Sequence, residues 1–337
     1  MSSPSTAEPE AAGGRPLRLA FLGCGSVTAK HCGTIRKTKR PVEFLFASRD
    51  PAKATDYATR FGGTALGSYA AAFADPGVDA VLVATPPDSH LELALGALRG
   101  GKHVIVEKPP FFRAADFDTV GGAAAAAGRQ AMIAENYFYK PLAVRLREIV
   151  RSGSLGEIRF VHLSALKRQK VEGWRGDAAV VGGGALFEGG IHWVNLAANL
   201  GLTVEEAHGY RPGAGDAAAS GGLERSMVVV LRYAEGAVGT LLHSWEAKSL
   251  LFGLRLSKIV GTEGSVTFES NGLVALERGR RTRLHFPGVR DLAGYRAMFE
   301  DFIDALRAGR EPALTWATAR RDLEIVEAAY GAPVPTS

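Results

Sequence analysis

Residues 17–28 have the sequence LRLAFLGCGSVT, in which a mostly apolar run leads directly into a glycine-rich turn. The run is typical of a buried strand, residues 23–27 interrupt it, and a helical stretch begins at about Thr28. Gly23 and Gly25 after a strand place backbone amides and a helix N-terminus against a ligand, which favours phosphate. The stretch therefore indicates the start of a dinucleotide-binding α/β fold. An ordinary glycine turn or an adenosyl-binding methyltransferase could show the same loop.

Strands and helices alternate through the first 137 residues. The short apolar runs expected to form strands are 17–22, 42–47, 80–84, 102–106 and 131–135. The helical stretches are 51–61, a helix that begins at Ser89, and 114–127. Ser89 with Glu92 three residues later has the pattern of a capping box, in which each side chain bonds the other's backbone amide. The alternation predicts a Rossmann domain, a doubly wound parallel sheet with helices on both faces, over residues 17–137.

The pattern changes after an expected helix at 142–151, because long alternating segments follow with turn residues between them. The expected strands are 157–166, 226–233, 237–245, 252–260, 265–269 and 273–277. Gly236, Gly264 and Gly272 stand where hairpin turns are needed, since glycine accepts a positive φ readily. Further helices are expected around 188–200, 291–308 and 315–330. Residues 138–337 are therefore expected to form a second α/β domain, with an open, mainly antiparallel sheet, that binds substrate and supports self-association.

The composition is that of a soluble globular chain. The 337 residues carry 40 Lys and Arg against 35 Asp and Glu, a net charge of +5, and are 46% hydrophobic and 22% charged. The basic residues are scattered among acidic ones, so no nucleic-acid partner is expected. No apolar run reaches the roughly 18 residues that a membrane span needs, so no membrane partner is expected either. The chain has only two cysteines, Cys24 and Cys32, so a fold held by a framework of disulfides is excluded.

Two segments lack the patterns of folded structure. Residues 1–16 are rich in Ser, Pro, Ala, Gly and Glu and lack the features of a secretion signal, so we expect a disordered tail on a cytoplasmic protein. The Gly- and Ala-rich stretch 213–222 predicts a mobile surface loop.

Ser48 and Arg49 follow the second expected strand, where a dinucleotide site usually presents an acidic residue to the adenosine ribose. A hydroxyl and a guanidinium suit a 2′-phosphate better than a 2′-hydroxyl, because the fork of arginine matches phosphate geometry. The pattern favours NADP(H), with NAD(H) as the alternative. In that alternative Arg49 is solvated or stacks on adenine, and Asp50 caps the next helix.

The segment Glu107-Lys108-Pro109 ends a parallel strand, at the edge of an open sheet where ligands of this architecture bind. A lysine at this edge can donate a proton or hold a substrate oxygen. Taken alone, a strand-end lysine is more often simply solvated.

Four motifs occur in the order seen in the glucose-fructose oxidoreductase and inositol dehydrogenase (Gfo/Idh/MocA) family, which the chain resembles over nearly its whole length after the tail. They are the Gly23-Cys24-Gly25 turn, Thr85-Pro86-Pro87 with His90, Glu107-Lys108-Pro109, and the run GGGALFEGGIH at 182–192. The resemblance implies a nucleotide-binding domain, then an α/β domain with an open sheet. It implies that NAD(H) or NADP(H) is bound and that a ring hydroxyl or ketone of a sugar or cyclitol is oxidised or reduced.

The resemblance also implies roles for particular residues. The catalytic lysine of the family matches Lys108 and its catalytic histidine matches His192. The peptide before the matching proline is often cis in the family, which the Lys108–Pro109 bond could adopt at modest cost. The dimers or tetramers of the family suggest that this chain forms a homodimer or homotetramer.

The chain departs from the family pattern on both sides of His192, because Glu188 and Asn195 stand where aspartates are common. On a helix, Glu188, His192, Asn195 and Asn199 share one face, and this polar stripe is expected to face a cleft or water. We expect Glu188 to orient His192 by accepting a hydrogen bond from one ring nitrogen. A surface Glu–His pair is the plainer alternative. No third ligand at suitable spacing accompanies the pair, so no metal is expected.

Trp174 and Arg175 precede the glycine run and resemble the substrate-side loop of the family. An aromatic ring can stack on a sugar or on nicotinamide, and arginine can hold hydroxyl or carboxylate oxygens. The alternative is a partly buried Trp beside a surface Arg. Lys167, Arg168 and Lys170 would suit an anionic group such as a nucleotide diphosphate, although such clusters are usually solvated loops.

The sequence thus predicts an NAD(P)-dependent dehydrogenase or reductase acting on CH–OH groups of a sugar, cyclitol or nucleotide sugar. The expected catalytic residues are Lys108, His192 and Glu188. The expected cofactor-binding residues are Gly23, Gly25, Ser26, Val27, Ser48, Arg49, Thr85, Pro86, His90, Glu107, Lys108 and Asn136. The expected substrate-binding residues are Lys108, Trp174, Arg175, His192 and Asn195. The alternative from another class is a non-catalytic NAD(P)-binding sensor of the same fold.

Overall fold

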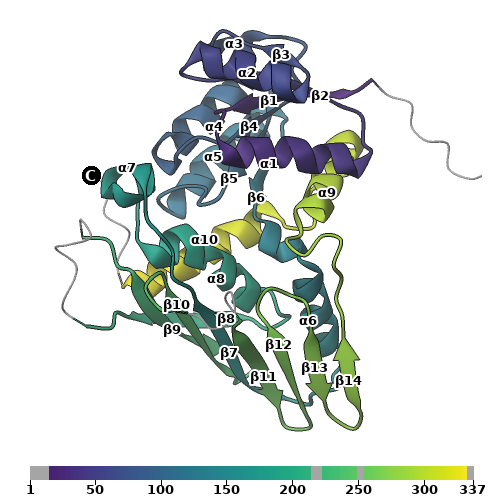
Figure 1. The fold of residues 1–337 in the computed structure, drawn as a ribbon, viewed down its shortest axis with the longest axis vertical. Coiled ribbons are helices and arrows are strands. Elements are labelled where there is room, and N and C mark those ends of the chain that lie inside the picture. Colours follow the sequence, from purple (N-terminus) through teal and green to yellow (C-terminus); the bar gives the residue numbers. More distant parts are fainter. Residues whose placement is uncertain (1–14, 214–221, 249–253, 332–337) are drawn as a thin grey trace, which may run out of the picture.

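The computed structural model describes residues 15–213, 222–248 and 254–331, which form two β-sheets joined by helices (Figure 1). The predicted tail over 1–16 lies outside the described residues except for Arg15 and Pro16, and the predicted loop over 213–222 lies outside them except for its two ends. None of the helices in the described part of the chain combines the length and the hydrophobicity that a membrane span requires. Both cysteines are free thiols.

The first sheet has six parallel strands in the order β3-β2-β1-β4-β5-β6. The strands are β1 (Leu17–Leu22), β2 (Val42–Ala47), β3 (Thr64–Ala65), β4 (Ala80–Val83), β5 (His103–Glu107) and β6 (Ala131–Ala134). The predicted doubly wound parallel sheet is confirmed, and β1 and β2 have the predicted bounds. The two-residue strand β3 was not predicted, since both of its residues are exposed and give no apolar signal.

Helices cover both faces of this sheet. They are α1 (Ser26–Ile35), α2 (Pro51–Phe61), α3 (Tyr69–Ala74), α4 (His90–Arg99) and α5 (Ala115–Ala127). Side chains alternate between the two faces along each strand, so Phe21 packs with α1 and α2, while Leu22 packs with α4 and α5. Helix α1 begins at Ser26, two residues before the predicted start.

The predicted capping box at Ser89 is wrong. The Ser89 hydroxyl donates to Thr85 Oγ1 (2.7 Å) or to the Pro86 carbonyl (2.9 Å), and it caps no amide of α4. A 3₁₀ turn, η2 (Pro87–Ser89), leads directly into α4, so the backbone carbonyl of Pro87 already accepts from the amide of His90. The serine side chain is therefore free to fix the Thr85 turn instead.

The second sheet has eight strands in the order β14-β13-β12-β11-β7-β10-β9-β8, all paired antiparallel except β7 with β10. The strands are β7 (Ile158–Leu166), β8 (Val204–Tyr210), β9 (Ser226–Tyr233), β10 (Val238–Ser244), β11 (Leu256–Gly261), β12 (Ser265–Glu269), β13 (Ala275–Arg278) and β14 (Thr282–His285). The predicted open, mainly antiparallel sheet is confirmed. Two edge strands, β8 and β14, were not predicted.

All three predicted hairpin turns join antiparallel strands, but their glycines serve different purposes. Gly236 and Gly272 have φ of +86° and +97°, as expected. Gly264 does not have a positive φ. A Cβ on Gly264 would lie 2.4 Å from the carbonyl oxygen of Arg278, so glycine is needed there for close backbone approach.

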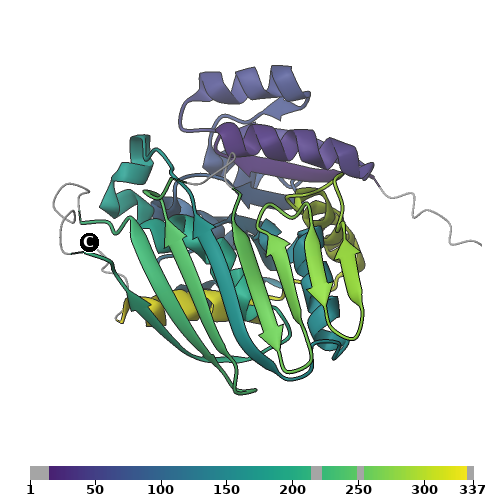
Figure 2. The same cartoon turned by 60° about the horizontal axis from the view of Figure 1, so that its bottom comes forward.

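Helices cover one face of the second sheet, and no helix of the described residues covers the other (Figure 2). The helices after residue 138 are α6 (Pro141–Arg151), α7 (Ala178–Val181), α8 (Ile191–Ala198), α9 (Tyr295–Ala308) and α10 (Trp316–Tyr330). Helices α8 and α10 pack against the covered face. Helix α9 instead buries Phe299 and Phe302 with Phe21 on the first sheet. The division of the chain at residue 138 stays a prediction, since α9 follows that boundary and packs with the first half.

Candidate active site

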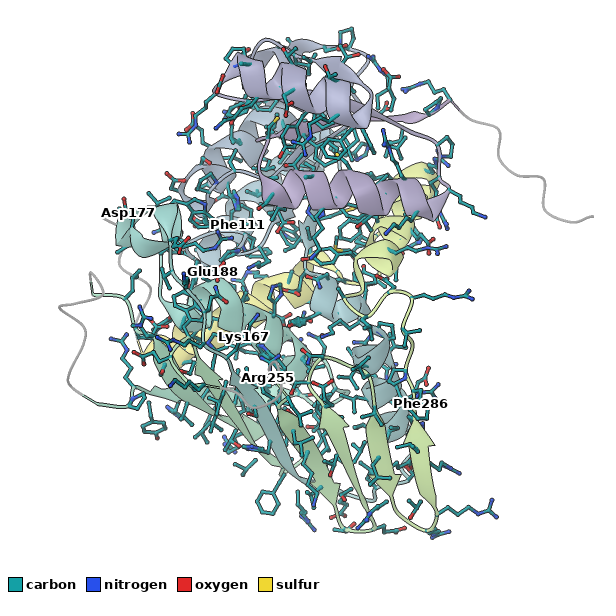
Figure 3. The ribbon with its side chains drawn as sticks, in the orientation of Figure 1. Phe111, Lys167, Asp177, Glu188, Arg255 and Phe286 are labelled. Carbon is teal, nitrogen blue, oxygen red and sulfur yellow. The ribbon has the colours of Figure 1, made fainter. Side chains whose placement is uncertain are left out.

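A pocket of about 640 Å³ lies where the carboxyl ends of the first-sheet strands meet the segment before α8. Glu188 lies in this region, between the two halves of the molecule (Figure 3). The described residues that line the pocket are Gly23, Cys24, Gly25, Ser26, Val27, Ser48, Arg49, Asp50, Lys53, Tyr69, Ala84, Thr85, Pro86, Pro87, Glu107, Lys108, Trp174, Arg175, Glu188, His192 and Tyr295. Ligands of open α/β sheets bind at this edge.

The glycine turn after β1 is shaped for close approach of a ligand. Gly23 has φ +100°, and a Cβ there would lie 2.7 Å from the carbonyl oxygen of Ala84. A Cβ on Gly25 would meet no atom within 4 Å, because it would point into open space. Among the described residues no side chain caps α1 and no acidic residue occupies its first turn. The free amides at this helix start fit the phosphates of a dinucleotide.

Gly25→Ala is expected to weaken cofactor binding without unfolding the protein. Gly25 has φ −115°, which alanine adopts, and the added methyl would occupy the approach to the free amides. We expect the Kd for the dinucleotide to rise at least about tenfold, the equivalent of about 1.4 kcal/mol. Fluorescence titration gives the Kd, and thermal unfolding gives the stability.

Gly23→Ala is compared with Gly25→Ala, because here the substitution should affect stability. Gly23 has a positive φ and no room for a Cβ, so alanine should lower the free energy of unfolding by about 1–2 kcal/mol. An unchanged Kd in Gly25→Ala would show that phosphates do not lie at this turn.

The far end of the pocket is basic. Arg49 is exposed at the rim, and Lys53 also lines this end. The carboxylate of Asp50 accepts from the amide of Ala52 (3.1 Å) and caps α2. The Ser48 hydroxyl accepts from the amide of Asp50 (3.2 Å), so this turn is held by its own side chains.

Lys108 meets Glu188 across the pocket. The Lys108 ammonium donates to the backbone carbonyl of Glu188 (2.9 Å) and lies 3.6 Å from the Glu188 carboxylate. Arg175 Nε donates to the same carboxylate (3.1 Å), which is buried. Burial opposes ionisation of Glu188, yet Lys108 and Arg175 together hold the pKa of this carboxyl below its ordinary value. The Lys108–Pro109 peptide is cis.

His192 is bonded to Glu135, a residue that the sequence did not suggest for the site. Nδ1 of His192 lies within hydrogen-bond distance of both carboxylate oxygens of Glu135, at 2.7 and 2.8 Å. The expected hydrogen bond from His192 to Glu188 is wrong. Residues Leu186–Gly190 form a π-helical turn, so a spacing of four residues does not place these two side chains as in an α-helix.

The expectation that Asn195 and Asn199 continue a polar stripe facing a cleft or water is wrong. Asn195 is 1% exposed and donates to buried Asp322 of α10 (2.6 Å), and Asn199 donates to the same carboxylate. Burial raises the pKa of Asp322 to about 6. Helix α10 therefore covers this face, and Asn195 does not line the pocket predicted to hold the substrate.

Two of the expected cofactor ligands lie outside the pocket lining. The ring of buried His90 lies with Nδ1 2.9 Å from the Pro109 carbonyl and Nε2 2.8 Å from the Thr85 carbonyl, so it holds two pocket turns together. Asn136 is buried and donates to the carbonyl of Ala293 (2.5 Å). The basic segment 167–170 also contributes no lining residue. Apart from these residues and Asn195, the expected site residues all line the pocket.

Sequence reasoning missed several residues at the site. Glu135 follows strand β6 at the carboxyl edge of the sheet, the same signal that singled out Lys108 after β5. His31 bonds the carboxylate of Glu107 from within α1, and no spacing in the sequence points to that pairing. Tyr295 comes from α9, far along the chain. Among the described residues no cluster of His, Cys, Asp and Glu could hold a metal ion.

Comparison with known proteins identifies the class to which this fold and pocket belong. Residues 17–135 match the family model described as "Oxidoreductase family, NAD-binding Rossmann fold", and residues 143–267 match the model of the GFO/IDH/MocA C-terminal domain. The chain belongs to the Gfo/Idh/MocA family of oxidoreductases, as the motifs predicted.

Two of the three relatives described next have names that refer to sugars. A dTDP-3,4-didehydro-2,6-dideoxy-alpha-D-glucose 3-reductase of Saccharopolyspora spinosa is 30% identical over 282 residues, which are 78% of this chain and 80% of the relative. The structure of GenD2 from gentamicin A biosynthesis, in complex with NAD, is 25% identical, with a TM-score of 0.81 over 99% of this chain and 98% of that chain. The aldose-aldose oxidoreductase of Caulobacter crescentus, complexed with glycerol, is 24% identical, with a TM-score of 0.83 over 95% and 98%. Because the Caulobacter protein is only 24% identical, its similarity to this chain concerns the fold alone.

Proposed function

We propose that this chain is an NAD(P)-dependent dehydrogenase or reductase acting on a ring hydroxyl or ketone of a sugar, cyclitol or nucleotide sugar. The observation that carries the proposal is the convergence of Lys108 and His192, from opposite halves of the molecule, on one pocket that continues to the glycine turn. The sugar-nucleotide name of the Saccharopolyspora relative supports this substrate class. The experiment that tests the proposal follows the oxidation state of the nicotinamide, by its absorbance, when candidate sugars are added to the purified protein with cofactor.

Two residues of the chain would have different roles at the reacting oxygen of the substrate. The bound nicotinamide would supply or take the hydride. His192 uses Nδ1 for Glu135, so its Nε2 is the ring atom left to exchange a proton with the substrate hydroxyl. The Lys108 ammonium, held by the Glu188 carbonyl, would stabilise negative charge that develops on the same oxygen. Trp174 and Arg175 line the same pocket and would contact the substrate.

NADP(H) is the proposed cofactor, because Arg49 and Lys53 bring two positive charges to the pocket that Ser48 also lines. Asp50, the acidic residue that could instead bind a ribose hydroxyl, already caps α2. NAD(H) is the alternative, and the GenD2 structure holds NAD.

Arg49→Ala is expected to remove most of the preference for NADPH over NADH. The loss of a charge-assisted contact of about 1.5–3 kcal/mol raises the Kd for NADPH roughly ten- to hundredfold and leaves the Kd for NADH nearly unchanged. Titration of both cofactors measures this, with Arg99→Ala, an exposed residue of α4 outside the pocket, as the control. Tighter binding of NADH than NADPH by the wild-type protein would refute the assignment.

The proposal includes self-association as a homodimer or homotetramer through the uncovered face of the second sheet. Phe160 on β7 and Leu256 on β11 are 60% and 58% exposed, and Val238 on β10 is 41% exposed. A sheet face this apolar is typical of a surface that binds another copy of the chain. The expected small-molecule partner binds elsewhere, in the pocket described above.

A further inference from the structure

The bond between Glu135 and His192 suggests a role for a carboxylate that the motifs do not include. We propose that Glu135 is the positioning residue of His192, which fixes the imidazole as the Nδ1–H tautomer and leaves Nε2 free to accept a proton. The consequence for turnover rests on the proposed function, whereas the tautomer itself can be measured without any substrate.

The geometry around Glu135 allows its carboxylate little freedom. Glu135 is 5% exposed, and its Oε1 accepts from the backbone amide of Tyr137 (2.8 Å) while both oxygens face His192 Nδ1. An ionised carboxylate only accepts hydrogen bonds, so the hydrogen of a neutral imidazole must be on Nδ1. The ring of Tyr137 lies edge-on to the imidazole, with centroids 4.4 Å apart, and limits its rotation.

Glu188, the nearer carboxylate in sequence, is engaged elsewhere. Its carboxylate is bonded by Arg175 and faces Lys108 at 3.6 Å. The site therefore holds two separate pairs, Glu135 with His192 and Glu188 with Lys108. Each pair joins the carboxyl edge of the first sheet to the segment 186–198 that packs on the second sheet.

The pairing matters because a histidine that takes a proton from a hydroxyl must present an unprotonated nitrogen to it. The two tautomers of imidazole are close in energy, and a hydrogen bond to one nitrogen selects between them. A neutral His192 with the hydrogen on Nε2 would present a donor where an acceptor is needed. Fixing the wrong tautomer in a catalytic histidine can cost up to about 10⁴-fold in kcat.

Nitrogen-15 NMR of the histidine rings tests the tautomer in the purified protein without substrate, at a pH where the ring is neutral. His192→Asn assigns the signal by its loss. We expect the Nδ1–H tautomer of His192 in the wild type and in Glu188→Gln, the matched control that removes the neighbouring charge. Glu135→Met, which keeps the length of the side chain but removes the acceptor, is expected to lose this tautomer. Glu135→Gln retains one acceptor oxygen and should preserve it in part.

An Nε2–H tautomer in the wild type would overturn the proposal, whether or not any variant folds. An unchanged tautomer in folded Glu135→Met would overturn it as well. In kinetic assays, Glu135→Met should lower kcat with little change in the KM for the cofactor, and Glu135→Gln should recover part of the loss. If no sugar is turned over, the proposed function fails while the NMR result still tests the pairing.

Discussion

Lys108→Met is expected to lower kcat by about 10²- to 10⁴-fold while the Kd for the cofactor stays within a few-fold. Lys108 bonds the carbonyl of Glu188, before α8, whereas the amides suited to phosphates are at the start of α1. Loss of the ammonium therefore removes stabilisation of the reacting oxygen more than binding of the dinucleotide. Steady-state kinetics at saturating cofactor measure kcat, and fluorescence titration measures the Kd.

Lys37→Met is the control for this variant, since Lys37 is exposed in the 3₁₀ turn Arg36–Thr38 and does not line the pocket. Turnover of Lys108→Met near the wild-type rate would remove Lys108 from the mechanism. A loss of cofactor binding equal to the loss in kcat/KM would make it a cofactor ligand instead.

His192→Ala is expected to have an effect of similar size, a loss of about 10²- to 10⁴-fold in kcat. His192 is the residue of α8 that lines the pocket, and alanine leaves a space beside Glu135 of the size of the lost ring. Added imidazole should enter that space and restore part of the rate, because the missing group is a proton acceptor. Rates measured over a series of imidazole concentrations test both expectations.

His162→Ala serves as the control, because His162 lies exposed on β7 and bonds Thr240 there. A His192→Ala variant that keeps the wild-type rate would show that another group moves the proton. A variant that is slow and insensitive to imidazole would show that His192 acts through structure.

The first sheet could be predicted from the sequence because its strands are buried on both faces. Leu17–Leu22 and Val42–Ala47 are apolar except for Arg18 and Glu43, near the start of each strand, so the bounds of both strands could be predicted from the sequence. Strand β8 (Val204–Tyr210) was missed because it is an edge strand in which only Ala207 is fully buried. Strand β14 (Thr282–His285) has no buried residue, so its sequence lacks the alternation of apolar and polar residues that indicates a strand.

The candidate site was predictable where a residue carries its own local signal. Lys108 and Gly23 follow strands of the first sheet, and their place at its carboxyl edge follows from the fold class alone. The partners of the site residues were not predictable in the same way. Glu135 and His192 are 57 residues apart, and only the tertiary structure brings them together.

The expected hydrogen bond between Glu188 and His192 is wrong because of the local backbone structure. A spacing of four residues predicts contact only if the segment is α-helical, and Leu186–Gly190 is a π-helical turn. The glycines at 189 and 190 allow close packing there, since a Cβ on Gly190 would lie 2.8 Å from the side chain of Leu186. Asn195 was misplaced because the sequence does not show that α10 would cover its face of α8.

Hydride transfer between a nicotinamide and a sugar carbon in this pocket is the property on which the proposed function depends most. The most direct test follows the nicotinamide absorbance of the purified protein with NADP(H) or NAD(H) against a panel of sugars, cyclitols and nucleotide sugars. We predict a substrate-dependent change in the wild type that Lys108→Met and His192→Ala abolish while still binding cofactor. Tight binding of cofactor and sugar with no change in absorbance, equal in all three proteins, would contradict the proposed function and indicate a non-catalytic sensor.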